Sequence, residues 1–135
     1  NVSKYLTYKY TYVDNGISVI SKDQAGRQDV PDLRINMNVD YSIGDHSVHY
    51  FANFIDSQTT WDYKGDDETT GLYEIEEYIS HNLSYNYQMP WSNAITLGVT
   101  NLTDEDPKFD KWGGYSGNLY SIRGRTFYLA YRQDF

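Results

Sequence analysis

Cysteine is absent from the 135 residues, proline occurs three times, and no run of 18 apolar residues is present. The lack of cysteine excludes a disulfide scaffold and cysteine metal sites. The lack of a long apolar run excludes a transmembrane helix. It leaves open a membrane β-barrel, because each barrel strand carries a much weaker hydropathy signal.

Positive charge is also scarce, with 11 Lys and Arg against 19 Asp and Glu, a formal net charge of −8. Such a surface repels a phosphate backbone, so we expect no nucleic-acid partner. What the chain has in excess is tyrosine, 15 residues, within an aromatic content of 17%. Because tyrosine has an apolar body and a polar tip, it suits strands at a boundary between water and an apolar phase.

Six segments alternate apolar and polar residues with the period of two that is typical of strands. They are residues 4–13, 33–43, 46–56, 78–88, 94–102 and 124–135. No helical periodicity, internal repeat or linker competes with this pattern. The sequence therefore predicts an all-β fold, an antiparallel up-and-down meander of about six long strands, as a single segment over residues 1–135.

The connections between these strands alternate in length. Residues 44–45 and 89–93 are short turns, whereas residues 14–32, 57–77 and 103–121 are long. In a meander, all the long connections then lie at one end. Long loops are uncommon in compact soluble domains but normal in outer-membrane barrels. We therefore expect part of a larger transmembrane barrel, with apolar faces toward lipid, although a soluble sheet with one buried face shows the same alternation.

The sequence contains no recognisable catalytic constellation. A phosphate-binding glycine loop, a nucleophile elbow and a zinc-binding HExxH motif are all missing. Of the three histidines, His46 and His49 lie three apart on a predicted strand and therefore face opposite sides. We expect neither enzymatic activity nor a cofactor.

Carboxylates and aromatic residues gather in the long connections. Asp66, Asp67 and Glu68 belong to an acidic stretch whose carboxylates could hold calcium, but its spacing does not match an EF-hand loop, and we favour a solvated loop without a metal. The loop aromatics are candidates for stacking on a ligand, with packing between loops as the alternative. They are Trp61, Tyr63, Tyr73, Trp112 and Tyr115. By contrast, Tyr85, Tyr87 and Trp91 flank a short turn, and we expect them at a membrane interface.

Three stretches carry a family resemblance. "ITLGVTNLTDEDP", residues 95–107, and "GRTFYLAYRQDF", residues 124–135, resemble the last two strands of TonB-dependent outer-membrane receptors. Upstream, "VPDLRINMNVDYSIGDHSVHYFANFIDS" resembles the family's proline-led strand, short turn and returning strand. Gln133 departs from the pattern, since an apolar or aromatic residue often stands third from the end.

The resemblance implies the last strands of a barrel of about 22 strands around a plug domain. It places the protein in the outer membrane of a Gram-negative bacterium, importing an iron chelate such as a siderophore, a cobalamin or an oligosaccharide. Its partners would be lipid, the remaining barrel strands and plug, and TonB, reached through an amino-terminal part absent from this chain. The terminal strand would be recognised by the barrel-assembly machinery. Its carrying residues are Gly124, Phe127, Leu129, Tyr131 and Phe135.

Two other functions remain open. A complete small barrel or pore needs at least eight strands, so further strands would have to lie within residues 14–29 or 57–77. A soluble β-sandwich acting as a carbohydrate-binding module predicts instead that the apolar strand residues are buried. Those residues are Leu33, Ile35, Met37, Leu83, Leu97 and Leu129. As an isolated open sheet, the chain would be expected to self-associate through its edges.

Overall fold

A computed structural model describes residues 1–60, 73–110 and 113–133. Within these ranges every regular element is a strand. They are β1 (Val2–Lys4), β2 (Thr11–Asp14), β3 (Ile17–Ile20), β4 (Leu33–Ile43), β5 (His46–Ile55), β6 (Gln58–Thr60), β7 (Tyr73–Ile75), β8 (Tyr78–Met89), β9 (Asn93–Thr100) and β10 (Thr126–Gln133). No helix long and apolar enough to cross a membrane occurs in the described part of the chain.

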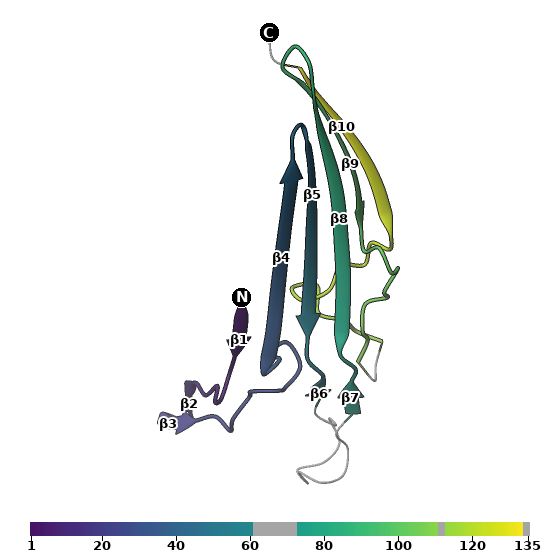
Figure 1. The fold of residues 1–135 in the computed structure, drawn as a ribbon. Coiled ribbons are helices and arrows are strands. Elements are labelled where there is room, and N and C mark those ends of the chain that lie inside the picture. Colours follow the sequence, from purple (N-terminus) through teal and green to yellow (C-terminus); the bar gives the residue numbers. More distant parts are fainter. Residues whose placement is uncertain (61–72, 111–112, 134–135) are drawn as a thin grey trace.

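One antiparallel sheet of six strands dominates the fold, in the order β1-β4-β5-β8-β9-β10 (Figure 1). Neighbours in this order are also neighbours along the chain, apart from the small hairpins β2–β3 and β6–β7. The predicted all-β antiparallel meander is therefore confirmed. Four of the predicted strands match β4, β5, β8 and β9 within two residues at each end.

Connection lengths sort to opposite ends of the sheet, as predicted. Figure 1 shows the tight turns β4–β5 and β8–β9 at the upper end. The two small hairpins and the connection from β9 to β10 lie at the lower end. Gly44 takes φ of 55° in the two-residue turn between β4 and β5. Glycine adopts this left-handed conformation without the steric cost that a Cβ would add.

The prediction of one long first strand over residues 4–13 is wrong. Only β1 pairs with β4, and β2 instead folds back on β3. Asn15 and Gly16, with φ of 49° and 81°, form the turn of this hairpin. Asn-Gly is the strongest short signal for a hairpin turn, because both central residues need positive φ. The hairpin lies outside the six-stranded sheet, as does β6–β7, so neither adds a strand to it.

Register places the alternating residues of all five long strands on two distinct faces. Tyr85 pairs with both Val48 and Leu97, and Leu97 pairs in turn with Leu129. These four side chains define what we call the apolar face. The opposite, polar face carries the Asn, Ser, Thr and Asp residues between them.

The described chain leaves most of the apolar face exposed, although Ala52 and Val99 on it are buried. Met37, Leu97 and Leu129 expose 47%, 47% and 65% of their surface. The small buried core lies instead at the lower end of the polar face, where Tyr120 from the β9–β10 connection packs with Ile55 and Tyr78. The burial that a closed sandwich predicts is thus missing for Met37, Leu83, Leu97 and Leu129, while Leu33 and Ile35 are half-buried.

Candidate functional site

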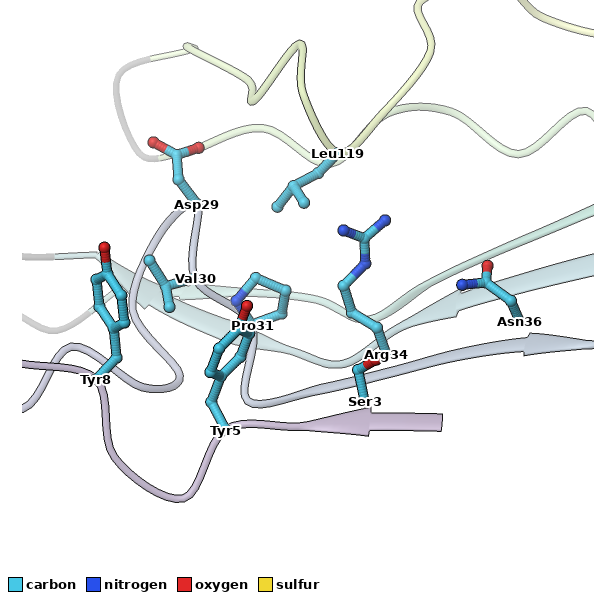
Figure 2. A pocket seen from close by; sticks show the side chains of 9 residues that line it. All are labelled: Ser3, Tyr5, Tyr8, Asp29, Val30, Pro31, Arg34, Asn36 and Leu119. Atoms are coloured by element: carbon cyan, nitrogen blue, oxygen red, sulfur yellow. The ribbon is translucent and has the colours of Figure 1, made fainter. Parts of the chain in front are cut away.

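A pocket of about 390 Å³ opens at the lower end of the polar face (Figure 2). β4 forms the floor of the pocket. The first wall is β1 with the segment after it, the second is the 29–31 segment, and the third is the β9–β10 connection. The lining residues are Ser3, Tyr5, Tyr8, Asp29, Val30, Pro31, Arg34, Asn36 and Leu119. The pocket is therefore assembled from parts of the chain that are far apart in sequence.

Backbone hydrogen bonds hold the amino-terminal wall in place. The Asn1 ammonium donates to the Asn36 carbonyl at 2.6 Å, and the Tyr5 N–H donates to the Asp32 carbonyl at 2.7 Å. The Tyr8 N–H donates to Asp23 Oδ1 at 2.8 Å. Hydrogen bonds from the Tyr8 and Ala25 backbone hold the pKa of Asp23 below its ordinary value of 3.8, because they stabilise the ionised carboxylate.

The wall that carries Asp29 is tied to β6. The Thr59 N–H donates to the Gly26 carbonyl at 2.9 Å, and the Gln28 N–H donates to the Thr59 carbonyl at 3.0 Å. Gln28 Nε2 also donates to Asp110 Oδ2 at 3.1 Å. Asp29 itself takes φ of 69°, a left-handed conformation that aspartate tolerates better than most residues. These bonds fix the pocket wall before any ligand binds.

The third wall is fixed through Tyr120, the neighbour of Leu119. Its ring contacts Tyr78 edge-on at a centroid distance of 5.1 Å, and its hydroxyl accepts a hydrogen bond from Gln58 Nε2 at 2.6 Å. Burial raises the pKa of Tyr120 above 10.0, since desolvation disfavours the phenolate, and the Gln58 hydrogen bond partly opposes this shift.

Arg34 is the chemically distinctive residue of the pocket. Its Nε is buried and has no hydrogen-bond partner among the described residues. Figure 2 shows its guanidinium extending from β4 toward Leu119, into the space between the walls. The sequence predicts Arg34, Asp40, Arg132 and Asp134 on the polar face, where the arginines would pair with the aspartates or with a plug domain. Asp40 instead accepts from His49 at 2.5 Å, and Asp134 lies outside the described residues.

The predicted loop aromatics are only partly visible in this structure. Trp61, Tyr63 and Trp112 lie outside the described residues. Tyr73 lines a second hollow, of about 680 Å³, which it shares with Phe109. Tyr115 packs edge-on against the same Phe109 at 5.8 Å. Phe109 was not predicted from the sequence. It contacts Tyr115 and lines the same hollow as Tyr73.

Asp66, Asp67 and Glu68, the weaker candidates for calcium binding, also lie outside the described residues. In the remaining chain, no group of three His, Cys, Asp or Glu side chains is arranged to hold a metal ion.

Aromatic residues cluster at the short-turn end on the apolar face. His46 stacks on Tyr87 at 4.8 Å, and its Nδ1 lies 2.6 Å from the Tyr85 hydroxyl. Trp91, in the β8–β9 turn, exposes 88% of its surface. Tyr85, Tyr87 and Trp91 were predicted at this end from the sequence, whereas His46 was predicted to be an ordinary strand residue. His49 lies on the opposite face, as predicted.

The terminal strand β10 pairs with β9 and has no second strand beside it in the described chain. Phe127, Leu129 and Tyr131 lie exposed on the apolar face. Gly124 precedes the strand, and Phe135 is outside the described residues.

A residue of the 95–107 stretch forms a hydrogen bond to the backbone just before β10. Asp104, at φ of 60°, accepts the Arg125 N–H through Oδ1 at 2.6 Å.

Comparisons of this chain with protein-family models, with curated proteins and with solved structures found no match.

Proposed function

We propose that this chain is the carboxy-terminal wall segment of a TonB-dependent receptor. Such a receptor imports a scarce nutrient, an iron chelate, a cobalamin or an oligosaccharide, across the outer membrane of a Gram-negative bacterium. The observation that carries the proposal is the largely exposed apolar face, combined with a core built on the opposite, polar face.

A water-soluble sheet covers its apolar face with a second layer, because exposed apolar surface costs about 25 cal/mol per Å². This chain has a connection long enough to do so, from β9 to β10, yet that connection packs on the polar face. Lipid would stabilise the apolar face, while the polar face would line the barrel interior.

The two ends of the sheet support the same orientation. Tyr85, Tyr87 and Trp91 lie at the short-turn end, where aromatic residues suit a membrane interface. The long connections at the other end would face outward, as in outer-membrane barrels. The free edge of β10 and the upper part of β4 would pair with further strands of the receptor, whose plug and TonB-contacting segment would also lie outside this chain.

Cysteine labelling tests the proposal, because the chain has no native cysteine. Leu129→Cys and Ala130→Cys change adjacent β10 residues on opposite faces, and both positions are exposed in this structure. In outer-membrane preparations we expect a water-soluble maleimide to label Ala130→Cys and to spare Leu129→Cys.

The same two variants unfolded in urea provide the control, since both cysteines should then react fully. Equal labelling of the two cysteines in native membranes, or recovery of the protein in the soluble fraction, would overturn the proposal. A soluble protein protected at Leu129→Cys would favour the carbohydrate-binding sandwich instead.

A further inference from the structure

We infer that the Arg34 pocket binds a small monocarboxylate with an apolar body, whose carboxylate pairs with the Arg34 guanidinium. The pocket consists entirely of residues in this chain, so the binding itself does not require the barrel. Its location at the outward mouth of an import channel, and hence the ligand's role as cargo, rests on the proposed function.

The first step is the unpaired cation. Arg34 is half-buried, and its Nε makes no hydrogen bond within the described chain. A buried donor without a partner destabilises a fold, and more so when it belongs to a charged group. The guanidinium presents a planar fork of donors that matches a carboxylate with two parallel hydrogen bonds. Because Nε is shut off from solvent, a bound carboxylate would pair with the two terminal nitrogens of the guanidinium, for which the described chain supplies no partner.

The second step is the net charge of the ligand. Asp29 lines the same pocket, and the whole chain carries a net charge of −8. A second negative charge on the ligand would be repelled by this carboxylate. The pocket therefore favours a single carboxylate over phosphate or a polyanion.

The third step is the body of the ligand. Val30, Pro31 and Leu119 supply aliphatic surface to the pocket, and Tyr5 and Tyr8 supply two rings that pack edge-on at 6.1 Å. Ring and aliphatic surfaces of this kind suit a flat apolar group. The volume of about 390 Å³ is in the range of small-molecule sites and fits a ligand with one ring.

Binding of radiolabelled phenylacetate to the purified chain in detergent micelles tests the inference, with equilibrium dialysis as the measurement. Unlabelled phenylacetamide has the same shape without the charge, and we expect it not to compete. Arg34→Gln should weaken phenylacetate binding about 10- to 100-fold, because it removes a charged hydrogen-bonding partner. Asp29→Asn should strengthen binding about two- to fivefold by removing repulsion.

Arg132→Gln is the matched control, since it removes one positive charge from the other end of the same face. We expect it to bind phenylacetate like the parent chain, and circular dichroism checks that each variant keeps its strands. Arg34→Lys keeps the charge without the planar fork and should give an intermediate affinity.

The inference is overturned if phenylacetate does not bind, if phenylacetamide competes equally, or if folded Arg34→Gln retains the parent affinity. Such a result leaves the membrane proposal untouched, because the maleimide experiment reads a different face. The opposite combination is also distinguishable. If the maleimide labelled residues 129 and 130 equally while phenylacetate binding still depended on Arg34, the chain would be a carboxylate-binding protein and not part of a barrel wall.

Discussion

Tyr128 on β10 covers Gly98, its register partner on β9, so closely that a Cβ on residue 98 would overlap the tyrosine ring. The two residues lie on the polar face, where the sheet would otherwise show a gap at the glycine. An aromatic ring laid across a glycine of the neighbouring strand pins the register and lets a sheet curve. The pair therefore links the last two strands, which carry the family resemblance.

Gly98→Ala should destabilise the sheet by about 1–3 kcal/mol, because the added methyl group displaces the Tyr128 ring. Urea denaturation followed by circular dichroism measures the loss. In the Tyr128→Ala background the same glycine substitution should cost less, since its steric partner is gone. Equal costs in both backgrounds would show that the ring is not what excludes a side chain at residue 98.

Trp91 is strained in its turn, with φ of 65° and 88% exposure. A left-handed conformation costs a non-glycine residue about 1–2 kcal/mol. Trp91→Gly should therefore stabilise the hairpin by about 1 kcal/mol while weakening partition into lipid vesicles, because the interfacial ring is lost. Ser92, at φ of 61°, offers the control: Ser92→Gly should give a similar gain with unchanged partition. A Trp91→Gly variant that partitions like the parent would argue against an interfacial role.

Asn101 closes the start of the β9–β10 connection through two reciprocal bonds with Glu105. Its Nδ2 donates to the Glu105 carbonyl at 2.8 Å, and its Oδ1 accepts the Glu105 N–H at 2.9 Å. Asn101 is buried and has φ of 52°, so Asn101→Ala should cost about 2–3 kcal/mol in unfolding free energy.

Asn101→Gly separates the two contributions, because it restores conformational freedom without restoring the bonds and should cost less than alanine. Asn38→Ala, at an exposed strand position, serves as the control and should change stability by less than about 0.5 kcal/mol. If Asn101→Ala matched that control, the connection would have to be held by other contacts.

Alkaline pH should weaken the small core through Tyr120. Its pKa is raised in the folded state by burial, so the folded protein holds this proton more tightly than the unfolded chain. Stability is then unaffected by this group below pH 10.0 and falls as the pH rises through the raised pKa. Tyr120→Phe removes this dependence but loses the Gln58 hydrogen bond, at about 1–3 kcal/mol near neutral pH.

The two proteins should therefore converge in unfolding free energy between pH 9 and pH 12, measured in urea at each pH. The two chains differ only at residue 120, so the difference between their unfolding free energies reports on Tyr120. A gap that stays constant across this range would refute the burial of an ionisable hydroxyl at residue 120.

Sequence alone was enough to predict the four long inner strands and their faces. Alternation along residues 33–43 and 78–88 requires a strand with one apolar side, since the side-chain period of a strand is two. Loop lengths then determined which ends of the sheet carry the long connections. The first strand was predicted wrongly because the same alternation continues through residues 4–13, while the Asn15-Gly16 turn redirects the chain.

Only the tertiary structure decided which face the chain covers and which residues meet there. Period-two patterning is identical for a sheet that buries its apolar face and one that presents it to lipid. The packing of Tyr120 on Ile55 and Tyr78 places the core of the described chain on the polar face, and most of the apolar face stays exposed. Likewise, no local pattern links Arg34 with Asp29 and Leu119. They line one pocket because hydrogen bonds between distant segments bring three connections together at one end of the sheet.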